Sequence, residues 1–127
     1  MANGINITDQ LEKIMDEYTK EVKRATNNSI DIVAKESVAK LKNTSPKKSG
    51  SYARGWGLVR ERGPGGINTV IVRNKTDYQL THLLEYGHVI VNAKGEFGRA
   101  PAHPHIAPVE SWAIDELPKE IKKELEG

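Results

Sequence analysis

The sequence predicts an α+β fold: a long N-terminal helix, a small antiparallel sheet with a central hairpin, a short middle helix and a C-terminal helix. Apolar residues recur at three- and four-residue spacing near the start of the chain and again near its end, which is the period of amphipathic helices. Between these regions, two strand-like segments flank the turn sequence Gly63-Pro64-Gly65-Gly66. With 127 residues, the chain is expected to form one domain over residues 1–127.

The first helix is expected over residues 7 to about 41. Its apolar stripe shifts at Asn27-Asn28-Ser29, a run of weak helix formers, so either the helix bends there or its two halves face different partners. Asn6 and Thr8 are both candidate N-caps, and Pro46 ends the helix because the residue before a proline avoids the helical region. Such a helix is roughly 50 Å long at 1.5 Å per residue. We therefore expect part of it to project from the domain and to pack against another chain.

The central hairpin is expected from two strands, residues 52–62 and 67–73, joined by the glycine-rich turn. Trp56 and Leu58 fall on one side of the first strand because side chains alternate between the two faces. The hairpin carries more positive charge than the rest of the chain, through Arg54, Arg60, Arg62 and Arg73.

The middle helix is expected between a start signal and a stop signal. Thr76-Asp77-Tyr78-Gln79 matches a capping box with Thr76 as N-cap, and Gly87 is well placed as the left-handed residue after the helix. The helix between them would bury Leu80, Leu83 and Leu84.

The last part of the chain is expected to contain a short strand, an exposed loop and the final helix. Residues 88–91 form the strand, and residues 92–105, with two glycines and two prolines before residue 105, form the long exposed loop. Pro108 suits the first turn of the final helix. Pro118 lies inside the helical pattern, which predicts a kink, or a break after which Pro118 restarts the helix.

Composition excludes several classes of protein. The absence of cysteine excludes a disulfide framework, a thiolate zinc site and a cysteine nucleophile. No apolar run approaches the roughly 20 residues that span a bilayer, and the start of the chain lacks the pattern of a signal peptide. We therefore expect a soluble protein that is made in a cytoplasm and contacts no membrane.

Catalytic chemistry has weak support in the sequence. His82 and Glu85 lie at three-residue spacing on a helix, an arrangement that purely structural pairs share. A metal enzyme built on His88, His103 and His105 is a third interpretation, but the chain lacks an established ligand spacing. We expect no catalytic residue, no metal and no cofactor.

Nucleic-acid binding is a stronger alternative. The basic hairpin 54–75 has aromatic residues beside it, and such a surface can hold a phosphate backbone and stack bases. However, the net charge of +2 is small, acidic residues on the long helix balance the hairpin, and no recognition motif is present. A small nucleic-acid-binding protein that uses this hairpin is the second interpretation.

Three sequence elements occur in an informative order. The first is Ser45-Pro46-Lys47-Lys48-Ser49-Gly50, the second is Leu84-Glu85-Tyr86-Gly87, and the third is Pro101-Ala102-His103-Pro104-His105-Ile106-Ala107-Pro108. In this order they resemble the tail-component family of long-tailed bacteriophages, which comprises neck and tail-completion proteins. Each element alone is weak, whereas the ordered trio is specific.

The resemblance implies a structural role in the virion. Members of this family are α+β proteins that assemble as rings, commonly of six subunits, which cap the tail tube and dock it onto the head connector. The expected partners are other copies of the chain, the head-closure or connector protein and the tail tube protein, with transient and non-specific contact to DNA in the lumen. The expected location is the neck or tail of the virion, and the host cytoplasm during assembly.

Two residue groups are expected to serve this role. The exposed loop has too few apolar residues to pack alone, so it would order on a partner or a neighbouring subunit, through Lys94, Phe97, Arg99, His103 and His105. The hairpin arginines would face DNA in the lumen, through Arg54, Arg60, Arg62 and Arg73.

Overall fold

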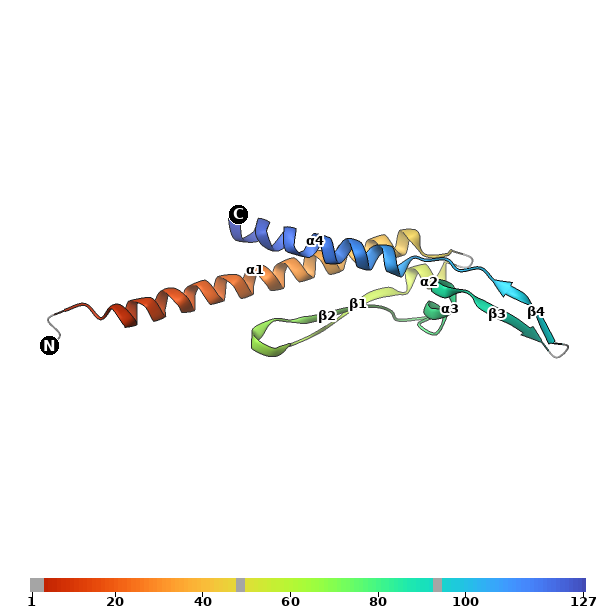
Figure 1. The fold of residues 1–127 in the computed structure, drawn as a ribbon, viewed down its shortest axis with the longest axis horizontal. Coiled ribbons are helices and arrows are strands. Elements are labelled where there is room, and N and C mark those ends of the chain that lie inside the picture. The colour runs from red at the N-terminus through yellow and green to blue at the C-terminus, as the bar shows by residue number, and fades with distance from the viewer. Residues whose placement is uncertain (1–3, 48–49, 93–94) are drawn as a thin grey trace.

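The protein is an elongated α+β molecule in which two helices lie beside a hairpin and a second hairpin extends from one end (Figure 1). The computed structural model describes residues 4–47, 50–92 and 95–127. The predicted class is confirmed, with these elements in chain order: α1 Ile7–Thr44, α2 Ser51–Arg54, β1 Trp56–Glu61, a 3-10 turn Pro64–Gly66, β2 Thr69–Asn74, α3 Leu80–Tyr86, β3 His88–Asn92, β4 Gly95–Ala100 and α4 Ile106–Glu126.

Helix α1 runs without a break through the run of weak helix formers. Asn6 is its N-cap and accepts a hydrogen bond from the backbone N–H of Asp9. Asn27 also has a structural task, because its side chain donates to Gly66 O at 2.9 Å and accepts from the backbone N–H of Asn68 at 2.8 Å. These bonds tie the middle of α1 to the turn of the first hairpin. The two halves of α1 have different surroundings: residues 7–21 are exposed, whereas the second half contains every buried position of the helix.

Helix α4 packs antiparallel against the second half of α1. Arg24 and Glu124 form an ion pair at 3.5 Å towards one end of the contact, and the Lys40 ammonium lies 4.5 Å from the centre of the Trp112 ring towards the other end. Ala25 and Ser29 are fully buried, and such small side chains let two helices approach closely. The predicted break at Pro118 is wrong, since α4 continues through it as one helix.

Strands β1 and β2 form an antiparallel pair in which Trp56 lies opposite Asn74 and Leu58 opposite Val72. Strand β1 starts later than predicted, because residues 51–54 form the short helix α2. Gly50 precedes this helix with a φ of 81°, a left-handed conformation that glycine adopts without strain. The turn brings Tyr52 inside the molecule, where it is buried.

Helix α3 also starts later than the predicted capping box. The Asn74 side chain accepts hydrogen bonds from the backbone N–H groups of Thr76 and Asp77, at 3.3 and 2.8 Å, which holds the following residues as turns. The capping box at Thr76 is therefore wrong, and the helix begins at Leu80. Gly87 ends it with the expected positive φ of 74°, but its ψ of 175° is extended, so the chain passes directly into β3.

The predicted strand after Gly87 is confirmed as β3, but the long exposed loop 92–105 is wrong in its first half. Strand β4 pairs antiparallel with β3, and the register joins His88 to Ala100 and Val89 to Arg99. Together the strands form an arm at the end of the molecule opposite the N-terminus (Figure 1). Of the predicted loop, the described residues 101–105 between β4 and α4 have no regular structure.

The hydrophobic core is small and lies where these elements converge. Its buried members come from α1, α2, β1 and α4: Leu41, Tyr52, Trp56 and Val109. Half-buried side chains of neighbouring elements complete it: Val38, Val72, Leu84 and Ile106. Because this core is small, polar contacts are also important for positioning the helices and strands.

Candidate functional site

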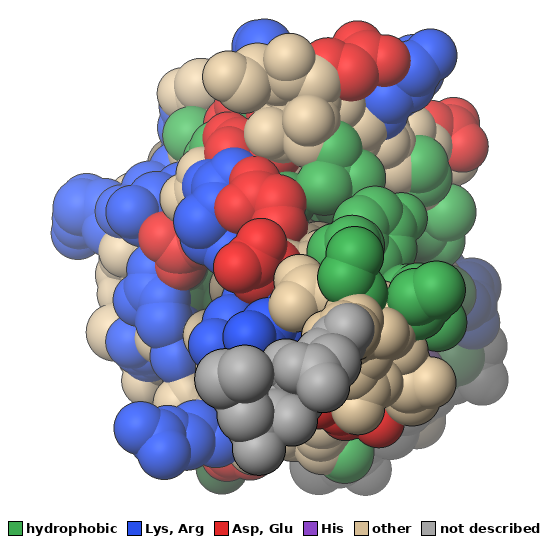
Figure 2. Space-filling model, turned by 90° about the vertical axis from the view of Figure 1, so that its left-hand side faces the viewer, with side chains coloured by type: hydrophobic (Ala, Val, Ile, Leu, Met, Phe, Trp, Pro, Cys, Tyr) green, Lys and Arg blue, Asp and Glu red, His purple; other side chains and the backbone are tan. Residues whose placement is uncertain are grey.

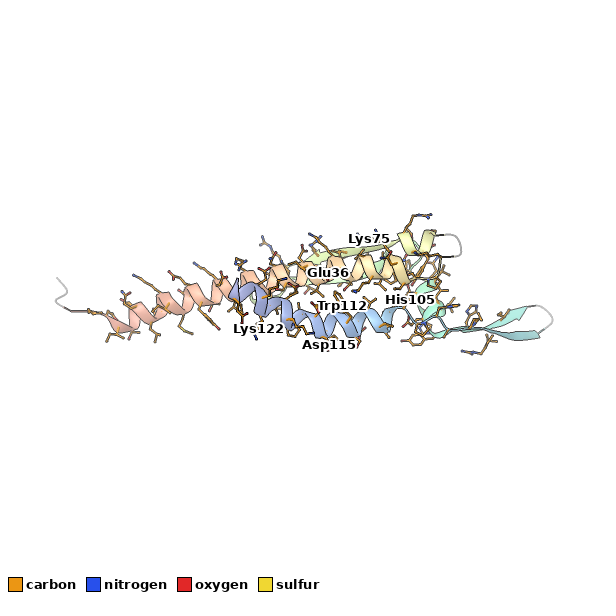
Figure 3. All side chains as sticks on the ribbon, turned by 90° about the horizontal axis from the view of Figure 1, so that it is seen from above. Glu36, Lys75, His105, Trp112, Asp115 and Lys122 are labelled. Atoms are coloured by element: carbon orange, nitrogen blue, oxygen red, sulfur yellow. The ribbon has the colours of Figure 1, made fainter. Side chains whose placement is uncertain are left out.

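A buried polar cluster lies beside the core, at the point where α4 begins. It consists of Tyr52 of α2, Glu85 of α3 and His105 at the start of α4, whose exposed fractions are 5%, 6% and 2%. Figure 3 places His105 at this junction, beside the end of α1. The three residues belong to segments far apart in the sequence, so the cluster joins α2, α3 and α4 into one unit.

Glu85 caps the N-terminus of α4 from another helix. Its Oε1 accepts hydrogen bonds from the backbone N–H groups of His105 and Ile106, at 2.7 and 2.9 Å, and its Oε2 accepts from Ala107 at 3.0 Å. The first N–H groups of a helix lack partners within the helix, and its dipole favours a negative charge there. Burial acts to raise the pKa of this carboxyl, but the three backbone donors and His105 outweigh it and lower the pKa below its ordinary value of 4.5.

His105 connects the carboxylate to the Tyr52 hydroxyl. Its Nδ1 lies 2.7 Å from His103 O and 3.0 Å from Glu85 Oε1, and its Nε2 lies 2.7 Å from the Tyr52 hydroxyl oxygen. With the proton on Nδ1, the ring donates to the carbonyl or the carboxylate and accepts from the hydroxyl. Burial raises the pKa of Tyr52 above its ordinary value of 10.0 and the nearby Glu85 charge acts in the same direction, against the opposing hydrogen bond with Thr81.

A carboxylate, a histidine and a hydroxyl in a row resemble a proton relay, but the surroundings favour a structural role. The hydroxyl and the imidazole are buried, and both carboxylate oxygens already accept from the backbone of α4. A nucleophile or general base must reach the atom on which it acts. The geometry therefore supports a structural role, in which Tyr52, Glu85 and His105 hold α4 against α3 and α2. We call these three residues the latch.

The segment after α1 is fixed by a second set of buried hydrogen bonds. The Ser45 hydroxyl donates to Leu41 O and accepts from Trp56 Nε1 at 2.8 Å. The Asn74 side chain donates to Tyr52 O at 2.6 Å. The bond between Ser45 and Trp56 joins the start of the first sequence element to β1, and the Glu85 cap joins the second element to the third.

Gly87 supports a sharp prediction about this junction. A Cβ at this position would lie 2.6 Å from Ala100 O, in a backbone whose φ is 74°. We expect Gly87→Ala to lower the free energy of unfolding by about 1–3 kcal/mol from the backbone conformation alone, with a further cost from the backbone clash. Gly65→Ala is the matched control, because Gly65 has a φ of 68° and nothing within 4 Å. Urea denaturation should show the larger loss for Gly87→Ala, and equal losses would contradict the proposed close contact.

Besides this buried junction, the molecule has two surface features that could contact a partner. Residues 7–21 of α1, which we call the projecting segment, extend beyond the C-terminal end of α4 (Figures 1 and 3). Large apolar side chains on it are more than half exposed: Ile7, Leu11, Ile14, Met15 and Tyr18. In a view onto the N-terminal end, hydrophobic side chains gather on one side and Lys and Arg side chains on the other (Figure 2).

The second feature is a cavity of about 640 Å³ between β2, α4 and the second half of α1, which we call the β2–α4 groove. Its lining is mostly apolar and includes Leu41, Val70, Val72, Ile106, Val109 and Ala113. Arg73 and Glu110 also line it. No sequence pattern predicts this groove, because its walls come from segments that are distant in the sequence.

Comparison with known families decides what kind of protein this is. A family model described as "HK97-gp10-like: Bacteriophage HK97-gp10, putative tail-component" matches residues 6–87, which is well over half of the chain. The chain belongs to this bacteriophage tail-component family. No curated protein and no solved structure matches the chain. The match covers the first two sequence elements and ends at Gly87, so the element 101–108 lies outside it.

The histidines of this tail component do not converge. His82 lies on α3 with its ring 5.0 Å from that of Tyr86, His88 lies at the start of β3, and His105 is engaged in the latch. In the part of the chain that the structure describes, no group of three or more His, Cys, Asp or Glu side chains is placed to hold a metal ion. Over the same residues, no helix is long and apolar enough to cross a membrane.

The four hairpin arginines of the tail component do not share one face. Arg60 lies on the side facing α1, where its Nε donates to Asp31 at 2.7 Å. Arg73 lies opposite Gly57 in the register, so the alternation of side chains points it to the other face. Arg54 and Arg62 are exposed, in α2 and just after β1. A lumen lined by Arg54, Arg60, Arg62 and Arg73 stays a prediction.

The five residues predicted to contact a partner also differ in their surroundings. Lys94 lies outside the described residues, as does the side chain of Phe97, although the backbone of Phe97 belongs to β4. Arg99 and His103 are exposed near the base of the arm. His105 is buried in the latch, where its ring nitrogens contact groups of its own chain.

The sequence missed the residues that build the latch. The sequence places Glu85 near His82 and within the second sequence element, but no pattern predicts its contact with the start of α4. An acid at the end of a helix is unfavourable without a distant donor. That mismatch with the dipole of its own helix is the signal that could have identified it.

Proposed function

We propose that this tail component forms a ring of identical subunits, commonly six, at the phage neck or tail end, where it completes the tail and joins it to the head connector. Its role is structural, with no catalytic step and no cofactor. The observation that carries the proposal is the projecting segment, whose large apolar side chains are exposed, whereas the following part of α1 lies against α4.

The energetics of this segment favour association between subunits. Fully burying one large aliphatic or aromatic side chain stabilises a structure by about 1.5–3 kcal/mol. Five such side chains are exposed on the projecting segment. Association must offset an entropy cost of several kcal/mol, which this much apolar surface is large enough to do.

The arm and the hairpin supply surfaces for the other expected partners. The β3–β4 arm extends from the opposite end of the molecule (Figure 1), so a ring of these subunits has a second surface for the connector or the tail tube protein. Arg99 and His103 lie exposed near its base. Arg54, Arg62 and Arg73 are exposed, as is Arg60 beside its ion pair with Asp31, and we propose that these arginines meet DNA transiently in the lumen. The protein would then reside in the virion and pass through the host cytoplasm during assembly.

Light scattering coupled to size-exclusion chromatography tests the ring directly. We expect a mass that is a multiple of the 14.1 kDa chain and ring-shaped particles with a central hole in electron micrographs. A monomer that binds DNA with a steep dependence on salt would overturn the ring and support the second candidate, a nucleic-acid-binding protein that uses the hairpin 54–75. The charge of the hairpin favours that candidate, since residues 54–75 contain five basic residues and one acidic residue.

A further inference from the structure

We propose that the projecting segment of one copy lies in the β2–α4 groove of a second copy of this chain. The proposal rests on the ring-forming function above and names the two surfaces that would meet. Each surface belongs to the same subunit, but they cannot meet within it, because α1 is one continuous helix that extends away from the groove (Figure 1).

The two surfaces match in chemical character. Ile7, Leu11, Ile14 and Tyr18 recur at four- and three-residue spacing, so they lie along one face of the projecting segment. This is the pattern of a helix that places anchor side chains into an apolar groove. The groove offers aliphatic walls from β2 and α4, with Leu41 of α1 among its lining residues.

The two surfaces also match in length. The projecting segment of residues 7–21 is about 22 Å long at 1.5 Å per residue. Strand β2, which forms one wall of the groove, has six residues and spans about 20 Å at 3.3 Å per residue. A helix that follows this wall would therefore use most of its exposed apolar face.

Charge favours the same pairing. Residues 7–21 contain five acidic and two basic residues, whereas the hairpin residues 54–75 contain five basic and one acidic residue. The groove itself is lined by one basic and one acidic residue, Arg73 and Glu110, so the favourable charge comes from the hairpin side of the groove, where it helps to fix the orientation. Pairing of two projecting segments with each other would instead bring together two acidic helices.

The contact joins different surfaces of the two copies, so each copy can give its segment to one neighbour and receive a segment from another. Such a head-to-tail contact produces a closed ring when the rotation between neighbours closes, and a filament when it does not. The contact thus provides the kind of symmetry that a ring around a tail tube needs.

Cross-linking tests the contact cleanly because the chain has no cysteine of its own. In the full-length protein, Ile14→Cys and Ala113→Cys place one thiol on the projecting segment and one in the groove. With a short bismaleimide, we expect the double variant to give a ladder of covalent oligomers. Ile14→Cys with Ser111→Cys is the matched control, because Ser111 is exposed on α4 and does not line the groove. Adding Leu11→Asp to the Ile14→Cys, Ala113→Cys variant keeps both thiols and should abolish the ladder, and Ile14→Asp alone should weaken association about tenfold or more.

Four results would overturn the contact. Cross-linking of Ile14→Cys alone would show that projecting segments pair with each other, and an equal ladder from the Ser111→Cys control would show random collision. Rings of the wild-type protein by light scattering and microscopy, without a ladder from the double variant, would leave the proposed function standing and exclude this contact. A wild-type monomer at the highest soluble concentration, also without a ladder, would overturn both.

Discussion

Glu85→Ala is expected to lower the free energy of unfolding by about 3 kcal/mol or more. Among substitutions outside the apolar core, this is the largest loss that we expect. The substitution leaves three backbone N–H groups at the start of α4 without their acceptor. A buried donor that loses its partner costs about 1–3 kcal/mol, and more when the partner is charged. The loss should be measured by urea denaturation followed by circular dichroism.

Two further variants separate the cap from other effects of the substitution. Tyr86→Ala changes the next residue, whose side chain is 66% exposed, and should cost far less. Glu85→Gln keeps the shape and one carbonyl acceptor but loses the charge, so its cost should lie between the two. If Glu85→Ala and Tyr86→Ala cost the same, Glu85 does not hold α4.

The pH dependence of the same variants gives an independent check. The pKa of Glu85 in the folded protein lies below its ordinary value of 4.5, so the folded state favours the ionised carboxylate. Its contribution is therefore fully present above the unfolded pKa and is lost as the pH falls through the folded pKa. The difference in unfolding free energy between wild type and Glu85→Gln should be constant near neutral pH and should shrink below about pH 4.5. A difference that grows on acidification would contradict the assignment.

Local patterns predicted the elements that depend on local contacts. The period of apolar residues is enough to identify α1 and α4, and the Gly63–Gly66 turn between β-branched segments is enough to identify the first hairpin. The prediction that part of α1 projects agrees with the exposure of residues 7–21. The resemblance to phage tail components, which came from three short elements, is confirmed by the family match.

The errors have two causes: contacts between residues distant in the sequence, and a local side-chain acceptor that competes with the predicted cap. Strand β4 contains two glycines and few apolar residues, so its propensity is low, and it becomes a strand because β3 pairs with it. His105 was assigned to an exposed loop, but Tyr52 and Glu85 lie 53 and 20 residues away from it in sequence and bury it. The predicted capping box is wrong because the side chain of Asn74, at the end of β2, accepts hydrogen bonds from the backbone N–H groups of Thr76 and Asp77. No pattern within a short window contains the partners of His105, whereas Asn74 lies only two and three residues from the donors that it binds.

Trp56→Ala is the second substitution with a large expected effect, at about 3–5 kcal/mol of lost stability. The Trp56 side chain is 5% exposed and belongs to the core cluster with Leu41, Tyr52 and Val109. It packs edge-on against Tyr52 with the ring centres 5.6 Å apart, and its Nε1 donates to Ser45. Its removal would therefore loosen the place where α1, α2, β1 and α4 meet. Trp112→Ala is the matched control, because Trp112 is only half-buried on α4 and should cost less.

The packing and the hydrogen bond of Trp56 can be measured separately. Trp56→Phe keeps an aromatic ring but removes the donor, whereas Ser45→Ala keeps the indole but leaves its buried N–H without an acceptor, which costs about 1–3 kcal/mol. If the bond between them is the main loss in both, the double variant should cost less than the sum of the single variants. Additive losses in urea denaturation would show that the two side chains act independently. In that case the hydrogen bond between Ser45 and Trp56 would not stabilise the start of the first sequence element, and only the apolar packing of Trp56 would.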